Sequence, residues 1–441
     1  MGRPSKSKSI RLWMNGIAVG RWTVSTDSAH EFEYDQGWLM DAVARPISLS
    51  MPLRQAPYKD DRVPAFFDNL LPDNNLIRHR IQTKFATSTT SPFDLLAEIG
   101  RDCVGAIQLL PDDEVPNNVH TITGTPVNDE EIELLLSNAI TLGRHQDNDD
   151  FRISIAGAQE KTALLRHQGQ WLKPHGATPT THIFKLPIGQ SGQLGIDLTT
   201  SVENEWLCEQ IMRAYGIETS NSEIKTFGSK KVLVVERFDR RFSNDNSWVL
   251  RIPQEDFCQA TGTPPGKKYE NDGGPSINKI MDILLGSQSA ERDRLEFFKI
   301  QIIFWMLCAI DGHGKNFSLF IGPEGKYSLT PCYDVLSAYP VLGHGTNKLS
   351  PHKIKIAMAF TGKNRHYKWD EILPRHIIET AQQCGLSDCE SLIRKVLEIT
   401  PEVIAKVTSM IPPEFPEEVA QPILVGLSDA AKKLETKPVS S

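Results

Sequence analysis

The sequence predicts an α+β fold with two lobes, the first rich in β-strands and the second helical. Short runs of β-forming residues dominate the chain up to about residue 252, whereas later segments show helical periodicity or helix caps. At 441 residues the chain is long enough for two or three domains. We divide it into an N-terminal α+β module at 1–110, a boundary segment at 111–150, a β-rich lobe at 151–252 and a helical lobe at 253–441.

The N-terminal module opens with a predicted hairpin. Residues 8–24 alternate as two strands around Asn15-Gly16, a dipeptide typical of a type I′ turn. One later helix has Ser91 as N-cap and Pro92 at its first position. The module is expected to contain extended segments at 32–34, 47–51 and 104–110 and helices at 75–84 and 91–100.

The remaining segments are assigned by the same patterns. Residues 111–150 are rich in Asp, Asn, Pro and Thr, and Asp147-Asn-Asp-Asp150 is more typical of a solvated loop than of a metal site. Beyond them we expect strands at 162–165, 181–187 and from 231 onward. Helices are expected at 129–139, 197–216, 253–261, 276–286, 291–310, 370–384, 388–409 and 415–434.

Composition and charge exclude several classes of protein. The net charge of −7 argues against a broad phosphate-binding surface. The basic start leads into no apolar core, so no signal peptide is expected. The most apolar run, Leu295–Ile310, is too short and too polar for a membrane span, which predicts a buried helix. Seven scattered cysteines without a C-x-x-C pair favour a reducing cytoplasm over a disulfide framework or a zinc site.

A candidate catalytic loop, Asp311-Gly-His-Gly-Lys-Asn316, follows this apolar run, and Asp334 follows the loop. Phosphoryl transfer needs a carboxylate that accepts or orients a hydroxyl proton, and oxygen ligands that hold Mg²⁺ against nucleotide phosphates. An Asp and an Asn five positions apart, with a second Asp downstream, is the order found in protein kinases. The pattern alone is weak because Asp and Asn are common in turns.

Three segments upstream supply the other groups that a kinase needs. Residues 155–161 form a small-residue loop whose N–H groups can approach phosphate oxygens, although a plain hairpin turn is the alternative. Lys185 lies in a β-rich run, where kinases carry a phosphate-binding lysine; the alternative is a lysine that faces solvent. Residues 236–238 end a buried strand, with backbone placed to meet an adenine edge.

An acidic helix completes the pattern. Glu203, Glu205 or Glu209 is a candidate partner for Lys185, with Glu205 preferred, and surface charge pairs are the alternative. The phosphate loop, the strand lysine, the acidic helix and the Asp–Asn–Asp set stand in the order of a kinase. Their joint order predicts an ATP-dependent phosphotransferase with a two-lobed protein-kinase-like fold.

Longer runs of residues closely resemble the bacterial HipA toxins, which are serine/threonine kinases of toxin–antitoxin modules linked to drug-tolerant persistence. The resemblance extends from about residue 10 to beyond 400. In the lobes it is carried by Phe151-Arg-Ile-Ser-Ile-Ala-Gly-Ala-Gln-Glu-Lys-Thr-Ala-Leu-Leu165, Thr178-Pro-Thr-Thr-His-Ile183, Val235-Glu-Arg-Phe-Asp-Arg-Arg241 and Asp311-Gly-His-Gly-Lys-Asn-Phe-Ser318. In the N-terminal module it is carried by Phe66-Phe-Asp-Asn-Leu-Leu-Pro-Asp73 and Glu98-Ile-Gly-Arg-Asp-Cys-Val-Gly-Ala106.

The resemblance implies a role for each matching residue. Asp311 would be the catalytic base, and Asn316 and Asp334 would bind Mg²⁺. Ser154 matches the family's autophosphorylated serine, and a phosphate there would add close to two negative charges to a phosphate-binding loop and inactivate it. The implied ATP contacts are Ile155, Ala156, Gly157, Ala158, Gln159, Glu160, Lys161, Lys185, Glu236, Arg237, Phe238, His313, Gly314, Lys315, Asn316, Tyr333 and Asp334.

The resemblance also implies partners. It implies a HipB-like helix-turn-helix antitoxin dimer, with which the kinase represses its own operon, and a protein substrate such as glutamyl-tRNA synthetase. Family members can approach operator DNA through basic residues on a C-terminal helix, but residues 380–386 contain no Lys or Arg. We therefore assign operator contacts mainly to the antitoxin. The expected cofactors are ATP and Mg²⁺, and no membrane partner is expected.

Two other functions stay open from the sequence. A catalytically weak co-repressor would act mainly by binding the antitoxin–DNA complex, and retained toxicity of an Asp334→Ala variant would favour it. A small-molecule or lipid kinase would use the same transfer chemistry, and phosphate that appears only on a metabolite would support it.

Overall fold

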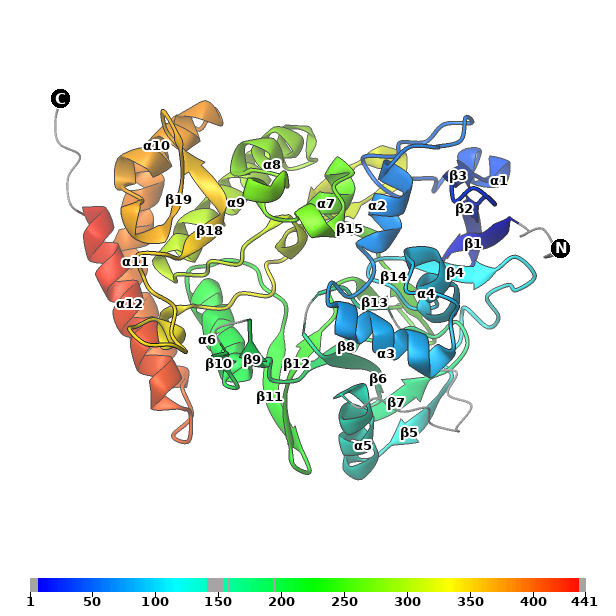
Figure 1. The fold of residues 1–441 in the computed structure, drawn as a ribbon, viewed down its shortest axis with the longest axis horizontal. Helices are drawn as coiled ribbons and strands as arrows, with labels where there is room; N and C mark the ends of the chain where they lie inside the picture. Colours follow the sequence, from blue (N-terminus) through cyan, green and yellow to red (C-terminus); the bar gives the residue numbers. More distant parts are fainter. Residues whose placement is uncertain (1–6, 141–153, 158, 193–194, 436–441) are drawn as a thin grey trace. The chain divides into compact units, whose positions relative to one another are not determined.

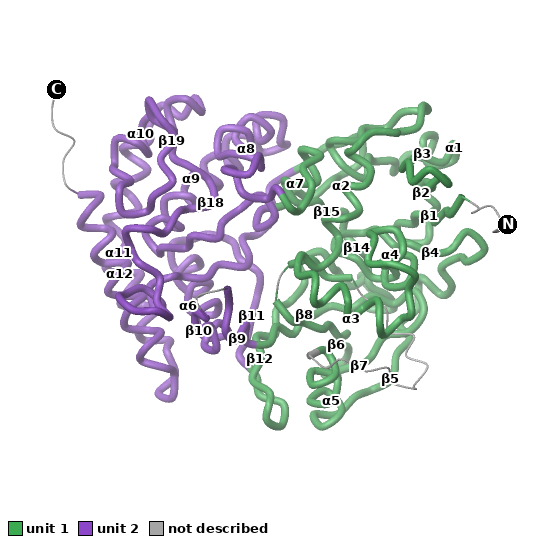
Figure 2. The backbone as a smooth tube through the Cα atoms, viewed as in Figure 1, with its two compact units in different colours: residues 1–186, 225–266, 318–327 green, residues 187–224, 267–317, 328–441 purple. Residues whose placement is uncertain are grey.

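The computed structural model describes residues 7–140, 154–157, 159–192 and 195–435, which fold into two compact units (Figures 1 and 2). Unit 1 comprises residues 1–186, 225–266 and 318–327, and unit 2 comprises residues 187–224, 267–317 and 328–441. Each unit is therefore built from three separate segments of the chain. Local sequence patterns do not reveal this division.

Unit 1 begins with an antiparallel sheet of four strands in the order β3-β2-β1-β4. The predicted hairpin is confirmed, with Asn15 and Gly16 at φ +47° and +85°, as a type I′ turn requires. The aromatic core includes Trp22 and Phe67, whose rings stack at a centroid distance of 3.9 Å. The strands are β1 Lys8–Met14, β2 Ile17–Val24, β3 His30–Tyr34 and β4 Ile107–Pro111; the helices are α1 Gln36–Leu39, α2 Arg62–Asp68, α3 Asn75–Phe85 and α4 Pro92–Ile99.

A second, six-stranded sheet belongs to unit 1 except for the first three residues of β11, and has the order β11-β12-β8-β6-β7-β5. Its strands are β5 Gly124–Val127, β6 Lys161–His167, β7 Gln170–Pro174, β8 His182–Lys185, β11 Ser222–Phe227 and β12 Lys230–Glu236. Helix α5, Asp129–Ile140, packs Ile132 and Leu136 against Leu164, Phe184 and Val234 of this sheet. Both β5 and α5 fall within the segment 111–150, which thus contributes an edge strand and a covering helix.

Unit 2 is mostly helical. Helix α9 is at its centre, and ten of its side chains, including Phe297, Phe298 and Trp305, are buried. Helix α11 packs on α6, where the Tyr215 hydroxyl lies 2.7 Å from the Thr400 hydroxyl. The helices are α6 Ser201–Ala214, α8 Ile277–Ile283, α9 Ala290–Met306, α10 Pro374–Gln383, α11 Cys389–Met410 and α12 Glu417–Glu435.

Short elements connect these parts. The remaining strands are β9 Gly189–Ser191, β10 Ile196–Leu198, β13 Arg240–Phe242, β14 Val249–Arg251, β15 Gln254–Asp256, β16 Ser318–Ile321, β17 Tyr327–Leu329, β18 Lys355–Thr361 and β19 Arg365–Lys368, and one further helix is α7 Phe257–Thr261. The 3₁₀ turns are Pro265–Lys267, Glu270–Asp272, Leu284–Gly286, Gly314–Asn316, Pro323–Gly325, Tyr339–Val341 and Trp369–Glu371.

Several element predictions are confirmed and others are wrong. The Ser91 cap with Pro92, and the helices predicted at 276–286, 388–409 and 415–434, are confirmed within a few residues. The helix predicted at 253–261 is wrong in its first half, because residues 254–256 pair with the distant strand β16. Residues 196–198 form a strand instead of the start of α6, and 47–51 form turns with one isolated bridge instead of an extended segment. The helix predicted at 291–310 ends at Met306, and the one predicted at 370–384 begins at Pro374.

Other sequence expectations have clear outcomes. All seven cysteines are free and buried, so the predicted absence of a disulfide framework is confirmed. No helix in the described part of the chain is both long and apolar enough to cross a membrane. Asp147–Asp150 lies outside the described residues.

Glu255 in β15 should make stability depend on pH. It is fully buried, and burial raises the pKa of its carboxyl from 4.5 to about 8. Hydrogen bonds from Ser48 and from the Leu49 N–H group lower the pKa, but burial has the larger effect. Because the folded state favours the protonated form, stability is greatest at low pH and is lost as the pH rises through about 8.

We expect the free energy of unfolding to fall by on the order of 2–4 kcal/mol between pH 5 and pH 9 through this group. Denaturant titrations at both pH values, on the natural protein and on Glu255→Gln, measure the difference. The neutral amide should remove most of this slope, and an identical slope in the two proteins would contradict the assignment.

Candidate active site

The predicted catalytic loop follows helix α9 in unit 2. Beyond Met306 the chain turns sharply, with Cys308 at φ +50°, and the Ala357 N–H of β18 donates to the Ile310 carbonyl at 3.0 Å. Gly312 packs so closely on Phe304 that a Cβ atom would lie 2.6 Å from Phe304 Cδ2. The loop is therefore held by the helix before it and by a strand that comes 46 residues later.

Asp311 is the exposed residue of an otherwise buried loop. Its side chain is 60% exposed, whereas residues 312–316 are buried. The Tyr269 hydroxyl donates to Asp311 Oδ1 at 2.5 Å, and His313 Nε2 lies 3.8 Å from Asp311 Oδ2. The ring of Tyr269 in turn meets the His313 ring edge-on at 5.1 Å. These contacts fix the orientation of the carboxylate and leave it open to an acceptor hydroxyl, as a general base requires.

Asn316 and Asp334, the predicted metal ligands, lie together in unit 2. Asn316 Nδ2 donates to the Asp334 carbonyl at 3.4 Å, and the Tyr333 hydroxyl donates to the Lys315 carbonyl at 2.8 Å. Asp334 has φ +60°, a left-handed conformation that non-glycine residues seldom adopt and that is enriched at functional sites. An amide oxygen and a carboxylate fit Mg²⁺, which prefers few protein oxygens and completes its shell with phosphates and water.

The predicted phosphate loop in unit 1 is anchored at Ser154 and Gly157. Ser154 is fully buried; its N–H donates to the Asp102 carbonyl at 3.0 Å and its Oγ donates to the Leu70 carbonyl at 2.8 Å. Gly157 has φ +112°, which favours glycine, and its carbonyl accepts the Asp73 N–H at 3.0 Å. The loop is therefore drawn toward the N-terminal module.

Two other side chains secure the same loop. Lys161 Nζ donates to the Ala156 carbonyl, and Gln159 Nε2 donates to the Leu186 carbonyl. Ala158, another predicted contact, lies outside the described residues. Residues 154–157 and 159–160 thus form a non-regular segment directly before β6, the kind of segment whose backbone N–H groups can bind phosphate.

Lys185 ends the central strand β8, opposite Lys161 on β6 and Leu233 on β12. It is only 7% exposed, so the alternative of a lysine that faces solvent is wrong. Among its candidate partners, Glu209 accepts hydrogen bonds from Arg213 at 3.0 Å, from Ser220 at 3.2 Å and from Ser222. Glu203 and Glu205 are also buried. The pairing of Lys185 with Glu205 stays a prediction.

The connector after β12 alternates in exposure. Glu236 is exposed and Phe238 is half-buried, whereas Arg237 is 4% exposed and points into the interior of unit 1. The Arg237 N–H donates to the Thr181 carbonyl at 2.9 Å, and the Arg237 carbonyl accepts the Arg240 N–H at 3.2 Å. Arg237, predicted with the nucleotide contacts, therefore anchors the connector with both its side chain and its backbone.

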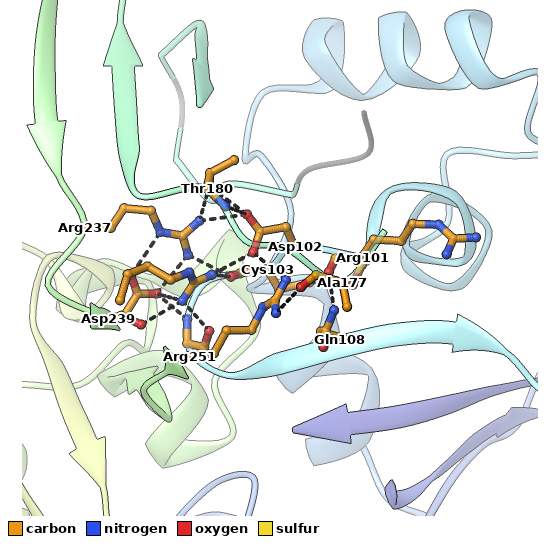
Figure 3. Close-up of polar contacts among 12 residues, drawn as sticks. Arg101, Asp102, Cys103, Gln108, Ala177, Thr180, Arg237, Asp239 and Arg251 are labelled. Carbon is orange, nitrogen blue, oxygen red and sulfur yellow. Dashed lines mark hydrogen bonds and ion pairs between the residues drawn. The ribbon is translucent and has the colours of Figure 1, made fainter. Parts of the chain in front are cut away.

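A buried charge network around Arg237 was not predicted (Figure 3). Asp102 accepts hydrogen bonds from Arg240 at 2.8 Å and from the hydroxyl of Thr180 at 2.6 Å, and Arg237 Nη2 donates to Asp239 at 2.9 Å. Arg251 lies 3.4 Å from Asp102. Burial alone would raise the pKa of Asp102, but the three guanidinium groups outweigh it and hold the pKa well below its ordinary value.

The sequence did contain a signal for this network. Asp102, Arg237 and Arg240 lie in two of the runs that carry the family resemblance, Glu98–Ala106 and Val235–Arg241. Both runs contain charges of both signs, and charged residues are seldom fully buried unless they are paired. The sequence does not show that these two runs, which are more than a hundred residues apart, lie in contact in the fold.

The fold and these residues define a protein of the protein-kinase-like α+β class. The chain belongs to the HipA family: the family model described as the HipA-like C-terminal domain matches residues 153–409, and the one described as the HipA N-terminal domain matches residues 10–136.

Relatives and solved structures agree with this assignment. The chain is 33% identical over 341 residues to the putative kinase Y4mE of Sinorhizobium fredii, which covers 76% of this chain and 78% of the relative. It is 24% identical over 438 residues to the serine/threonine-protein kinase toxin HipA of Shewanella oneidensis, covering 94% and 93% of the two chains. The solved structure of that organism's HipA, in a complex with HipB and operator DNA, matches with a TM-score of 0.78 at 23% identity and covers 96% of this chain and 97% of that chain.

Proposed function

We propose that this protein is an Mg²⁺·ATP-dependent serine/threonine protein kinase and the toxin of a toxin–antitoxin module. The observation that carries the proposal is the catalytic loop itself: Asp311 is exposed and oriented by Tyr269, and Asn316 is tied to Asp334. A phosphotransferase needs this combination of an accessible base and paired oxygen ligands. Curated relatives named as a kinase toxin and as putative kinases support it.

In the proposed reaction Asp311 accepts the proton of a serine or threonine hydroxyl on the substrate protein. The hydroxyl oxygen forms a bond to the γ-phosphorus of ATP, the bond to the β,γ-bridging oxygen breaks, and ADP leaves with that electron pair. Bound Mg²⁺ would neutralise charge on the phosphates, with Asn316 and Asp334 as its protein ligands. Lys185 and the segment 155–161 would position the phosphates, and Glu236 and Phe238 the adenine.

Ser154 is the proposed site of self-inactivation. Its hydroxyl is fully buried and donates to the Leu70 carbonyl, so a phosphoserine would lose that donor and bring close to two negative charges against a carbonyl oxygen. Phosphorylated Ser154 is therefore incompatible with the position described here, and the loop would have to leave it. This supports autophosphorylation as an off switch.

The proposal extends to partners. One solved structure with the same fold was determined with HipB and operator DNA, which supports a HipB-like antitoxin that links this protein to its operator and gives it a co-repressor role. The candidate substrate is a translation protein, and the family resemblance suggests glutamyl-tRNA synthetase. The proposed location of the protein is the cytoplasm.

Calorimetric titration of ATP tests the proposed metal site. The natural protein should bind ATP at least tenfold more tightly with Mg²⁺ than with EDTA, and Asp334→Ala should lose this difference because a metal ligand is missing. The matched control is Asp429→Ala, which removes an exposed carboxylate on α12 that pairs with Lys432. Full Mg²⁺ dependence in Asp334→Ala would contradict the assignment.

A further inference from the structure

The N-terminal module contacts the phosphate loop at three points within unit 1. At the first point, the Asp102 and Leu70 carbonyls accept the N–H and Oγ of Ser154. At the second, the Asp73 N–H donates to the Gly157 carbonyl, and Pro72 and Gly157 form a parallel bridge. Every one of these partners comes from the segments 70–73 and 102, outside the β-rich sheet that the loop leads into.

The third contact is an ion pair. Arg80 on α3 pairs with Glu160, the residue before β6, and the two side chains are 17% and 23% exposed. The Leu186 N–H donates to the Glu160 carbonyl at 3.1 Å, so Glu160 lies at the junction between the loop and the central strands. A partly buried pair is less screened than a surface pair, and it holds the loop's C-terminal end to α3.

Asp102 connects this clamp to the connector. Its backbone carbonyl holds Ser154, while its carboxylate binds Thr180 and Arg240 and lies 3.4 Å from Arg237 (Figure 3). One residue of the N-terminal module therefore contacts both the phosphate loop and the segment proposed to hold adenine. The residues that carry these contacts are buried or nearly so, which leaves little freedom for either segment to move alone.

We propose that the N-terminal module is a clamp that sets the position of the phosphate loop, with Arg80 and Asp102 as positioning residues for nucleotide binding. The inference rests on the proposed function insofar as ATP is the ligand of the loop. It assigns to the module a control over ATP affinity: while these contacts are intact the loop is held in place for ATP, and when they are lost its affinity for ATP falls.

Charge reversal of the Arg80–Glu160 pair tests the clamp. The proteins are Arg80→Glu, Glu160→Arg and the double variant, and the control is Lys59→Glu, which reverses an exposed pair with Glu31 in the same module. Hydrogen exchange of the peptide 154–161 is measured by mass spectrometry without nucleotide, and kcat and KM for ATP are measured separately. Arg80→Gln serves if Arg80→Glu does not fold.

Each single reversal should speed exchange of that peptide about tenfold, because repulsion replaces attraction at the loop. Arg80→Glu should also raise KM for ATP about tenfold, with kcat within about twofold. The double variant should recover the slow exchange, and Lys59→Glu should change neither the exchange rate nor KM. Unchanged exchange in Arg80→Glu, or no recovery in the double variant, would overturn the clamp. If the natural protein binds no ATP, the proposed function fails, but the exchange result still decides the clamp.

Discussion

Asp311→Asn should lower kcat for phosphoryl transfer by about 10²–10⁴-fold, the contribution typical of a positioned general base. The change is nearly isosteric, and an Asn side-chain oxygen can still accept the Tyr269 hydroxyl bond seen at 2.5 Å. What is lost is the carboxylate that takes the acceptor proton. Affinity for ATP should stay within about twofold, because the proposed phosphate and adenine contacts are other residues.

The measurement is the initial rate of phosphate transfer from labelled ATP, together with the dissociation constant of ATP for each protein. Asp429→Asn is the matched control, since it makes the same chemical change at an exposed position of the same unit. A transfer rate in Asp311→Asn equal to that of the natural protein would show that another group is the base.

Asp102→Asn should lower the free energy of unfolding by about 3–5 kcal/mol, as expected when one partner of a buried ion network is removed. The network contains two carboxylates and three guanidinium groups, all with side chains at most 7% exposed. Without the Asp102 charge, Asp239 alone faces Arg237, Arg240 and Arg251. The buried cations then repel one another with too little compensation.

Denaturant unfolding of the two proteins gives this difference directly. The control is Asp112→Asn, whose carboxylate pairs with Arg21 at the surface with side chains 35% and 38% exposed, and which should cost less than about 1 kcal/mol. A loss of under about 1 kcal/mol in Asp102→Asn would mean that the network contributes little to the fold.

Local chemistry explains which elements could be predicted from the sequence. The turn at Asn15-Gly16 and the cap at Ser91 depend on backbone conformations that those residues favour, and both are confirmed. The catalytic loop could be located because its residue types and spacing follow from phosphoryl-transfer chemistry. Its support by Tyr269 and by β18 could not, because neither lies near it in the sequence.

Long-range pairing explains the failures. Residues 254–256 have a helix-compatible pattern, but they pair with β16, more than sixty residues later. The inward position of the Arg237 side chain has a similar cause, because it is drawn there by its carboxylate partners, one of them on the N-terminal module. Its nucleotide contact stays a prediction. Tertiary contacts of this kind override local propensity.

The most direct test of the account is to map phosphate on the protein itself. The purified chain and Asp311→Asn are each incubated with Mg²⁺ and ATP, and intact-mass and peptide mass spectrometry follow. We expect one added phosphate at Ser154 in the natural protein and none in Asp311→Asn, which would establish kinase activity, its base and its regulatory site in one experiment. An equal phosphate at Ser154 in both proteins would contradict the assigned base, and a natural protein that gains no phosphate and binds no ATP would contradict the proposal that it is a kinase.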